Sequence, residues 1–341
     1  MFKYELPLHY ALPLKADGIN VRRGFIVELT DKYGRVAYGE ASPLPSFSVE
    51  SLEQAGRVLY SQLHCLVSEK GKQSQINFFS SGASPSASFA IESALWGLSV
   101  KHWLPSPKLA PLLLGDVDCI RQRLREWKGG WPSEFKMKVA RGAVVDDVKR
   151  VIAVFKLLPE SVSIRLDANQ KWTLSEALEF SYRLLTQAGT NGYGVLKKIA
   201  YIEEPTANIA EFPGFYRETG IGYALDESIQ HCRTVNTLGY KGLKAVVIKP
   251  TLIGGLHDCR QLTNGLLLAG IRVILSSSFE SIIGIHCLAQ LSAHWFPGEM
   301  PGLDTLSAFV ENIIEEMPES GYPLPEAALN KLELVWEEEQ T

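Results

Sequence analysis

The chain has 341 residues, of which 46% are hydrophobic and 21% are charged, and its formal net charge is -4. These fractions are typical of a folded globular protein and exclude disorder as its dominant state. The acidic balance, 34 Lys and Arg against 38 Asp and Glu, argues against nucleic acid as the main partner, because nucleic-acid binding demands a basic face.

Cysteine usage and hydropathy predict a cytoplasmic protein with no membrane partner. The five cysteines are scattered without a CxxC pair, which indicates reduced thiols rather than a disulfide framework or a zinc site. The first 18 residues lack an apolar signal-peptide core, and the apolar run near 266–275 is interrupted by Arg272.

The first third of the chain reads as an α+β unit. Residues 23–31 and 35–43 look like two strands that flank a turn at 31–34. Residues 49–67 then carry apolar side chains at helical spacing, and a second helix is expected over 88–100.

Short apolar runs alternate with helical patterns from about residue 110 onward. Helices are predicted over 146–158 and 174–189, and the alternation predicts a parallel sheet. At least six such units in a row favour a barrel, and no glycine-rich phosphate loop follows any strand. The basic stretch 121–131 is interpreted as the solvated side of a helix. Strands are predicted over 135–140, 163–169, 199–205, 222–228, 244–250 and 273–278.

Ionisable side chains end five successive predicted strands of this run. Barrel active sites lie at the C-terminal ends of the strands, where the loops of all units converge. We therefore expect these side chains to share one site. They are Lys136 and Lys138, Asp167, Glu203 with Glu204, Asp226 with Glu227, and Lys249.

Three carboxylates from adjacent strands predict a divalent cation. Asp167, Glu203 and Asp226 would repel one another strongly unless a cation neutralised them. An all-oxygen ligand set suits Mg²⁺, with Mn²⁺ as a possible substitute. The alternative is that each carboxylate caps a loop or pairs with a nearby lysine.

The lysines suggest proton abstraction next to a carboxylate. Lys136 and Lys138 are two residues apart on one predicted strand, so their side chains face the same side of the sheet. Lys249 lies on a strand several positions further around the predicted barrel. An ammonium beside a divalent cation and a second ammonium has a lowered pKa, which makes the amine a usable base near neutral pH. The alternative is that the lysines are simple counter-charges to the acids.

Seven motifs in this order resemble the enolase superfamily, in its muconate-lactonising-enzyme-like branch, and within it the o-succinylbenzoate synthase family. The resemblance covers about residues 130–310 and rests on KMK, LDAN, IEEP, LDES, VIKPTLIGG, SSSFES and PGLDTL. It implies an α/β fold: a modified TIM barrel of (β/α)7β type at 106–310, an α+β capping domain at 1–105, and a C-terminal segment, 311–341, that returns to the cap. GEASPLPSFS resembles the family's substrate-covering loop.

The resemblance also implies a reaction, the Mg²⁺-dependent syn dehydration of 2-succinyl-6-hydroxy-2,4-cyclohexadiene-1-carboxylate to 2-succinylbenzoate in menaquinone or phylloquinone biosynthesis. Carried over by position, the metal ligands fall on Asp167, Glu203 and Asp226, and the two catalytic lysines on Lys138 and Lys249. Lys138 would remove the α-proton, and Lys249 would act by charge or accept a proton. Supporting roles fall on Lys136, Asn169, Glu204 and Glu227, and contacts to the succinyl end of the small-molecule carboxylate substrate on Ser276, Ser277, Ser278 and Gly302.

Related activities share these core motifs. N-succinylamino acid racemases and dipeptide epimerases use the same lysines and metal ligands, and a non-catalytic metal-binding barrel is the alternative from another class. Segment 15–24 matches the lid that separates such relatives, and Arg22 and Arg23 would either reach a substrate carboxylate or simply end a strand. Trp172 would line the site or pack in the core, and His286 is expected to be structural. The sequence sets no oligomeric state.

Overall fold

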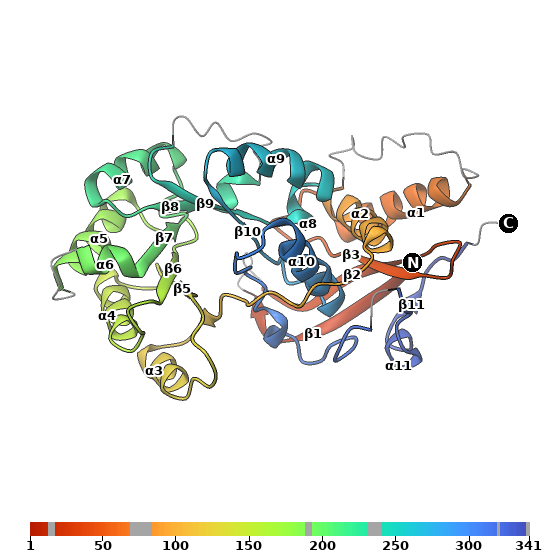
Figure 1. The fold of residues 1–341 in the computed structure, drawn as a ribbon, viewed down its shortest axis with the longest axis horizontal. Coiled ribbons are helices and arrows are strands. Elements are labelled where there is room, and N and C mark those ends of the chain that lie inside the picture. The colour runs from red at the N-terminus through yellow and green to blue at the C-terminus, as the bar shows by residue number, and fades with distance from the viewer. Residues whose placement is uncertain (13–17, 69–83, 188–192, 231–239, 319–320, 339–341) are drawn as a thin grey trace.

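An antiparallel sheet with helices on one face forms one end of the molecule (Figure 1). The computed structural model describes residues 1–12, 18–68, 84–187, 193–230, 240–318 and 321–338. The sheet has the order β11-β1-β2-β3 and is covered by α1 and α2. These elements are β1 (Phe2–Leu12), β2 (Ile19–Thr30), β3 (Val36–Ala41), β11 (Glu333–Leu334), α1 (Leu52–Ser68) and α2 (Pro85–Ser99).

Both ends of the chain meet on this sheet. β11 runs antiparallel to β1 with Leu334 opposite Phe2, and the Met1 ammonium donates to the Trp336 carbonyl at 2.7 Å. α2 packs tightly on the sheet because Gly39 has no side chain: a Cβ there would lie 1.8 Å from the Ala90 carbonyl oxygen. The last segment of the chain thus lies against the first.

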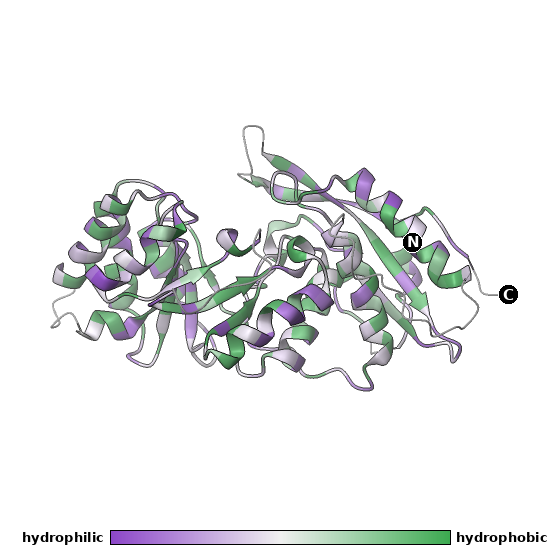
Figure 2. Cartoon of the chain, turned by 90° about the horizontal axis from the view of Figure 1, so that it is seen from above, coloured by the Kyte–Doolittle hydropathy of each residue, from purple (hydrophilic) through white to green (hydrophobic). Residues whose placement is uncertain are grey.

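A seven-stranded parallel sheet curls through the other part of the molecule, in the order β4-β5-β6-β7-β8-β9-β10. Six of these strands are those that the sequence predicts; β4 has only two residues, too few for any period. In Figure 2 hydrophobic stretches occur along the strands, and the helices carry both hydrophobic and hydrophilic residues. The strands are β4 (Leu112–Leu113), β5 (Glu134–Lys138), β6 (Ser163–Asp167), β7 (Ile199–Glu203), β8 (Tyr223–Leu225), β9 (Leu243–Ile248) and β10 (Arg272–Leu275).

Helices cover the outside of this sheet. α4 shows why: Val148, Val151 and Val154 recur on one face and are buried, so the helix lies with that face on the strands. α10 is buried on nearly all sides because it lies between β10 of the parallel sheet and β3 of the antiparallel sheet. The helices are α3 (Val117–Arg125), α4 (Val144–Phe155), α5 (Leu174–Gln187), α6 (Tyr193–Lys198), α7 (Phe212–Thr219), α8 (Pro250–Ile253), α9 (Leu256–Leu268), α10 (Ile282–Trp295) and α11 (Glu326–Leu329), with single 3₁₀ turns η2 (Ile209–Glu211), η3 (Glu227–Ile229) and η5 (Leu306–Ala308).

Residues 300–303 fill the eighth position of the barrel. Gly302 forms a parallel bridge with Ser276, and its N–H donates to the Leu275 carbonyl at 2.8 Å. On the other side, the Ala110 N–H donates to the Pro301 carbonyl at 3.2 Å, just before β4. The fold is therefore a modified TIM barrel with a capping domain, as the sequence predicts, and its eighth strand is reduced to a single bridge.

Ion pairs tie β5 and β6 to β10, the last strand of the sheet, at the N-terminal end of the barrel. Arg165 on β6 is 2% exposed; its Nε donates to Glu134 Oε2 and its Nη1 to the Met300 carbonyl at 2.8 Å. Arg272 at the start of β10 donates to Glu134 Oε1 at 2.8 Å. Glu134 on β5 therefore links β6 and β10 across the seam.

Replacement of Arg165 leaves the buried Glu134 carboxylate paired only with Arg272. We predict that Arg165→Met lowers the free energy of unfolding by about 3 kcal/mol, because an incompletely paired buried charge is costly. Urea unfolding of both proteins measures this difference. A loss below about 1 kcal/mol would show that the pair contributes little to barrel closure.

A buried carboxylate on α2 joins the cap to the barrel. Glu92 on α2 accepts a hydrogen bond from the His257 N–H, at the start of α9, at 2.8 Å. Gly255 allows this approach, since a Cβ there would lie 2.8 Å from Glu92 Oε1. Burial raises the pKa of Glu92 to about 7, and the nearby Asp258 carboxylate adds to the rise, while main-chain hydrogen bonds oppose it.

The raised pKa makes stability depend on pH. Between the ordinary pKa of 4.5 and about 7, the native protein holds a proton on Glu92 that the unfolded chain has released, so stability falls as pH rises through this window. We predict that the contribution reaches at most about 3 kcal/mol and is absent in Glu92→Gln. Unfolding free energies measured between pH 5 and pH 8 test it: parallel curves for the two proteins would contradict the assignment.

Candidate active site

Charged side chains from neighbouring strands lie together at the C-terminal end of the barrel. Lys138 on β5 is in register with Asp167 on β6, which is in register with Glu203 on β7. All three end their strands, and the two carboxylates are at most 1% exposed. Two further strands contribute Asp226, directly after β8, and Lys249, directly after β9.

The lysines of β5 hold the first two carboxylates. Lys136 Nζ lies 2.8 Å from both Asp167 Oδ2 and Glu203 Oε1. Lys138 Nζ lies 2.7 Å from Asp167 Oδ2 and 2.6 Å from Asn169 Oδ1. Because the two lysines alternate on the strand, both ammonium groups reach the same side of the sheet.

Lys249 approaches from another part of the ring. Its Nζ lies 2.7 Å and 2.5 Å from the two oxygens of Asp226. Three strands separate β9 from β5 in the sheet, so Lys249 and Lys138 project toward the site from different sides.

Glu204 fixes the loop that carries Asp226. Its Oε1 accepts from the N–H groups of Asp226 at 2.7 Å and Ser228 at 2.8 Å, and its Oε2 accepts from the Ser228 hydroxyl at 2.7 Å and Gln170 Nε2 at 2.9 Å. Glu204 has a φ of 45°, a costly conformation that persists only where the surroundings enforce it. Gln170 and Ser228 were not singled out by the sequence analysis, because their role depends on a contact across two loops.

Asn169 links Lys138 to the far side of the site. Its Oδ1 accepts from Lys138, while its Nδ2 donates to Glu227 Oε1 at 3.0 Å. Burial, with the adjacent Asp226 carboxylate, raises the pKa of Glu227 to about 7. Asn169 thus orients the amine without adding charge.

The electrostatics at the strand ends show how crowded the negative charges are. Burial and the Asp167 carboxylate raise the pKa of Glu203 well above its usual range, although Lys136 opposes the rise. Burial also disfavours charge on Asp167, but Lys136 and Lys138 outweigh it and hold the pKa of Asp167 well below its usual range. One of these carboxyl groups is therefore short of positive charge, which fits a site that accepts a further cation.

The donor set itself suits Mg²⁺. Asp167, Glu203 and Asp226 are buried carboxylates on three consecutive strands, and hard divalent cations prefer such oxygen ligands. Among the described residues, no three acidic, histidine or cysteine side chains are arranged as they stand to hold a metal ion, and the Lys136 ammonium is shared by Asp167 and Glu203. Lys136, Lys138 and Lys249 pair with these carboxylates, but the pKa of Glu203 stays raised despite the nearby Lys136 ammonium.

The pKa of two lysines is raised in this arrangement, and the lowering expected beside a divalent cation stays a prediction. Burial alone would lower the pKa of Lys249, but Asp226 and Glu227 reverse this effect and raise it. The pKa of Lys136 is likewise raised, because Asp167 and Glu203 outweigh its burial. The prediction assumed carboxylates engaged by a cation, whereas here they act on the ammonium groups.

The residues expected to hold the succinyl end follow β10. The Ser276 hydroxyl donates to the Gly302 carbonyl at 3.1 Å, and the Ser277 hydroxyl lies 2.9 Å from Thr305 Oγ1. The Ser278 hydroxyl is buried with no partner in the described part of the chain. Gly302 must be small, since a Cβ there would lie 2.9 Å from the Ser276 hydroxyl oxygen.

Four residues with open interpretations are now placed. Arg23 is exposed and pairs with Glu5 at 2.9 Å, whereas Arg22 is buried at the contact between cap and barrel. Trp172 packs on Phe180 in the barrel core. His286 is half-buried with its ring nearly perpendicular to that of Trp103, and partial burial lowers its pKa to about 4. The lid segment is only partly placed, because residues 15–17 lie outside the described residues.

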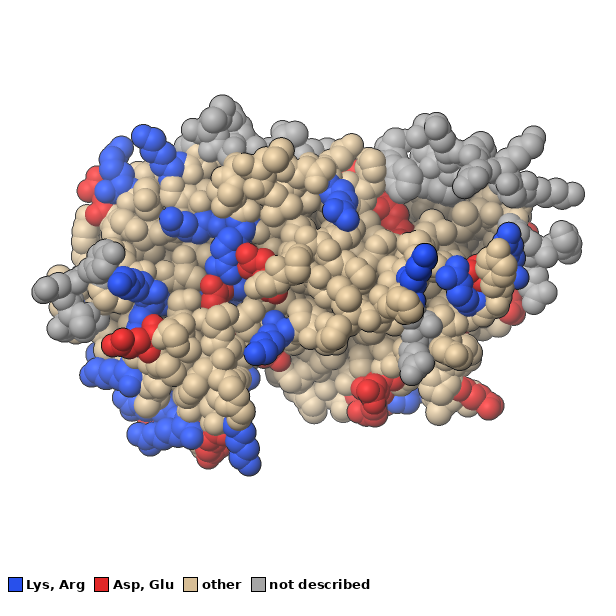
Figure 3. Space-filling view, viewed as in Figure 1, with Lys and Arg blue, Asp and Glu red and all other residues tan. Residues whose placement is uncertain are grey.

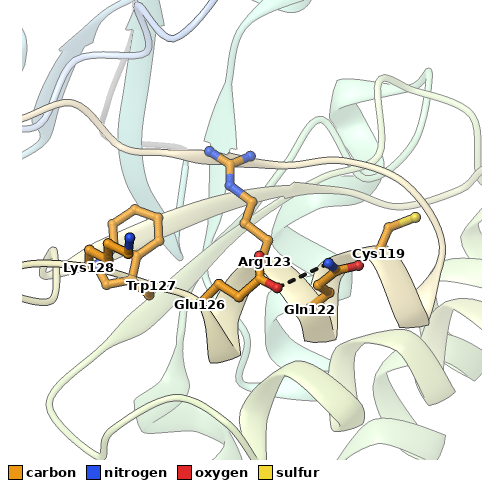
Figure 4. Close-up of a pocket in the computed structure, with 6 residues that line it drawn as sticks. All are labelled: Cys119, Gln122, Arg123, Glu126, Trp127 and Lys128. Atoms are coloured by element: carbon orange, nitrogen blue, oxygen red, sulfur yellow. Dashed lines mark hydrogen bonds between the residues drawn. The ribbon is translucent and has the colours of Figure 1, made fainter.

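The basic stretch 121–131 lies apart from these strand ends. Figure 3 shows basic side chains gathered over the barrel near α3 and α4, intermixed with acidic ones. A surface groove of about 530 Å³ runs along α3 (Figure 4). In it Gln122 pairs with Glu126 at 3.0 Å, and the Arg123 guanidinium donates to the Leu112 carbonyl at 2.6 Å. Its polar groups are thus engaged with the protein itself.

Comparison with known proteins identifies both parts of the chain. Residues 120–320 match the family described as "Enolase C-terminal domain-like", and residues 1–98 match "MenC, N-terminal domain". The chain is 33% identical to the o-succinylbenzoate synthase of Vibrio cholerae, over 100% of this chain and 98% of that protein. It is also 33% identical to the o-succinylbenzoate synthase of Pectobacterium atrosepticum, over 99% of this chain and 98% of that protein.

Solved structures give the same result. The o-succinylbenzoate synthase of Thermosynechococcus elongatus, with Mg in its active site, is 26% identical with a TM-score of 0.68, over 88% of this chain and 90% of that one. The L-Ala-D/L-Glu epimerase of Bacillus subtilis has a TM-score of 0.75 at 18% identity, over 94% of this chain and 95% of that one, which shows the fold alone. Within the described residues, no helix is both long and apolar enough to cross a membrane.

The hydrogen bonds of Glu204 lead to a prediction about metal affinity. In Glu204→Gln an NH₂ group replaces one carboxylate oxygen. Both oxygens of Glu204 face only hydrogen-bond donors, so the new NH₂ group would face another donor and the Asp226 loop must shift. We predict that the Kd for Mg²⁺, measured by calorimetry, rises by about 10-fold to 100-fold. Glu179→Gln, an exposed change on α5, is the matched control. An unchanged Kd in Glu204→Gln would show that the loop does not depend on this carboxylate.

Proposed function

This chain belongs to the o-succinylbenzoate synthase family of the enolase superfamily, and from that premise we propose which of its residues carry the family's reaction. The chain is a hydro-lyase of menaquinone biosynthesis. It dehydrates 2-succinyl-6-hydroxy-2,4-cyclohexadiene-1-carboxylate to 2-succinylbenzoate, and its cofactor is a divalent cation, Mg²⁺.

One observation carries the assignment of residues. Lys138 and Lys249 reach a common site from strands that three others separate, and buried carboxylates lie between them. We propose that Asp167, Glu203 and Asp226 hold the cation, with Mn²⁺ able to substitute. When bound, the cation supplies positive charge that offsets the negative charge developing on the substrate carboxylate.

In the proposed mechanism Lys138 is the base. Its neutral amine takes the α-proton, and the C–H electron pair moves toward the carboxylate. The resulting ammonium then gives a proton to the departing hydroxyl group on the same face, so the C–O bond breaks, water leaves and the ring becomes aromatic. Asn169, 2.6 Å from Lys138 Nζ, keeps the amine aimed.

The remaining residues support charge and position. Lys249, on the other face, stabilises the developing negative charge, and Lys136 balances Asp167 and Glu203. Glu204 and Glu227 hold the loops that bear the ligands and Asn169. Ser276, Ser277, Ser278 and Gly302 form the strand-end surface proposed for the succinyl end.

The domain boundaries, the partners and the location of the protein complete the proposal. We assign residues 1–105 to the cap, 106–310 to the barrel and 311–341 to the segment that returns to the cap, which the pairing of β11 with β1 supports. The substrate is the small carboxylate, with no nucleic acid or membrane as partner. A cytoplasmic location stays a prediction from the cysteine pattern.

The test follows loss of the diene absorbance after purified protein and MgCl₂ are added to the substrate. We predict that EDTA abolishes the reaction and that Lys138→Ala lowers kcat by about 10²-fold to 10⁴-fold, the usual contribution of a positioned base. Lys149→Ala, at an exposed lysine paired with Asp146 on α4, should leave kcat unchanged.

Two results would contradict the proposal in different ways. Full activity of Lys138→Ala with normal Mg²⁺ affinity would remove Lys138 from the mechanism. An intact diene in the presence of wild-type protein would overturn the dehydration itself, and exchange of deuterium into N-succinylamino acids would then identify racemase chemistry.

A further inference from the structure

Arg22 is a buried cation between the cap and the barrel. It lies on β2 of the antiparallel sheet and is 1% exposed. Its guanidinium donates to four main-chain carbonyls, those of Ser42 at 2.7 Å, Phe279 at 3.0 Å, Pro43 at 3.1 Å and Ser278 at 3.3 Å. A planar fork with donors on three nitrogens can make such a set of bonds, and the single ammonium of a lysine cannot.

These bonds join two segments that are far apart in the sequence. Ser42 and Pro43 directly follow β3 of the cap, whereas Ser278 and Phe279 follow β10 of the barrel. The second segment adjoins the active site, because the Ser276 N–H donates to the Ile248 carbonyl, immediately before Lys249, at 2.9 Å. Arg22 therefore sets the distance between the cap and the strand-end loop beside Lys249.

The barrel segment is held in a strained shape. Phe279 has a φ of 60°, which is costly for a bulky side chain and persists only where neighbours enforce it. Two contacts do so: Arg22 Nε binds the Phe279 carbonyl, and the Ser278 N–H donates to the Glu280 carboxylate at 2.5 Å. Loss of the Arg22 bonds would leave this loop free to relax, and the Ser278 hydroxyl would move with it.

The cap segment also depends on Arg22. Leu44 is buried, and the chain on either side of it forms one wall of an open cavity of about 720 Å³, with residues 18–23 as another wall. Ser46 in this wall has a φ of 73°. Hydrogen bonds from the N–H groups of Phe47 and Ser48 to the Leu44 carbonyl shape this segment locally, and the Arg22 bonds at Ser42 and Pro43 attach its start to the barrel loop.

Buried carboxylates supply the counter-charge for Arg22 without direct hydrogen bonds to it. Glu40 is 0% exposed and accepts from the Tyr4 hydroxyl at 2.6 Å and from the N–H groups of Ser281 and Gly284, both at 2.9 Å. Glu280, also 0% exposed, lies on the barrel side. Burial and Glu40 raise the pKa of Glu280 to about 7, although Arg22 lies close enough to lower that pKa, and the donors of Arg22 bind the four carbonyls instead.

We propose that Arg22 is a positioning residue for substrate binding: it fixes the cap segment at 42–43 against the barrel loop at 278–279, so that the part of the substrate remote from Lys138 is held in place. The inference rests on the proposed function. An interaction made equally in the bound substrate and in the transition state changes KM and leaves kcat unchanged. Arg22 acts on such remote contacts, so its loss should appear in KM.

The test compares variants of two buried arginines that lie at opposite ends of the barrel. Arg22→Met and Arg165→Met each remove a buried guanidinium: that of Arg22 donates to four main-chain carbonyls at the C-terminal end of the barrel, and that of Arg165 donates to the Met300 carbonyl and to Glu134 at the opposite end. In the diene assay, below the unfolding transition of each variant, Arg22→Met should raise KM by about 10-fold to 100-fold with kcat within about threefold and the Kd for Mg²⁺ unchanged. Arg165→Met should leave KM unchanged, and Arg22→Lys, which restores charge but not the four bonds, should raise KM less than Arg22→Met does.

The outcomes distinguish a failure of this inference from a failure of the proposed function. Three results would overturn the inference while the wild-type protein stays active, which leaves the proposed function intact. They are an unchanged KM in Arg22→Met, a fall only in kcat in that variant, and an equal rise of KM in Arg165→Met. Wild-type protein that does not consume the diene overturns both. If Arg22→Met does not fold, Arg22→Lys decides: a raised KM with kcat little changed supports the inference, and an unchanged KM overturns it.

Discussion

Buried charges of opposite sign at one edge of the barrel impose the constraint on which the active site depends. Asp167 and Glu203 share the Lys136 ammonium, Lys138 adds a second, and Asp226 has Lys249. Charges so far from water persist only when each is paired or bound to a cation. The same groups are therefore bound either to one another or to a divalent cation and an anionic substrate, and this choice links metal binding to the freedom of the lysines.

The rest of the structure holds that edge in place. Parallel strands bring successive strand ends side by side, and the bridge at Gly302 closes the ring where a full strand is lacking. Glu204 positions the Asp226 loop through main-chain bonds, so a residue that needs no contact with substrate still shapes the site. Arg22 and Glu92 then attach the cap at two places, next to the loops that follow β10 and β9.

The sequence predicted the barrel and the strand-end residues because both leave local signals: apolar runs of strand length, each ending in an ionisable residue. It did not predict β4 or the bridge at Gly302, which are too short to show a period. The roles of Gln170, Ser228 and Arg22 were also out of reach, since each depends on contacts across the fold. The pKa of Lys249 depends on which cation the Asp226 carboxylate binds: its pairing with Asp226 raises that pKa here, and the lowering beside a divalent cation stays a prediction.

The central claim is that Asp167, Glu203 and Asp226 together form the cation site. Its most direct test is the anomalous scattering of Mn²⁺ in crystals of the wild-type protein soaked in MnCl₂. The account predicts one strong peak within bonding distance of all three carboxylates. A peak elsewhere, or none at these strand ends with the ion in excess, would contradict it.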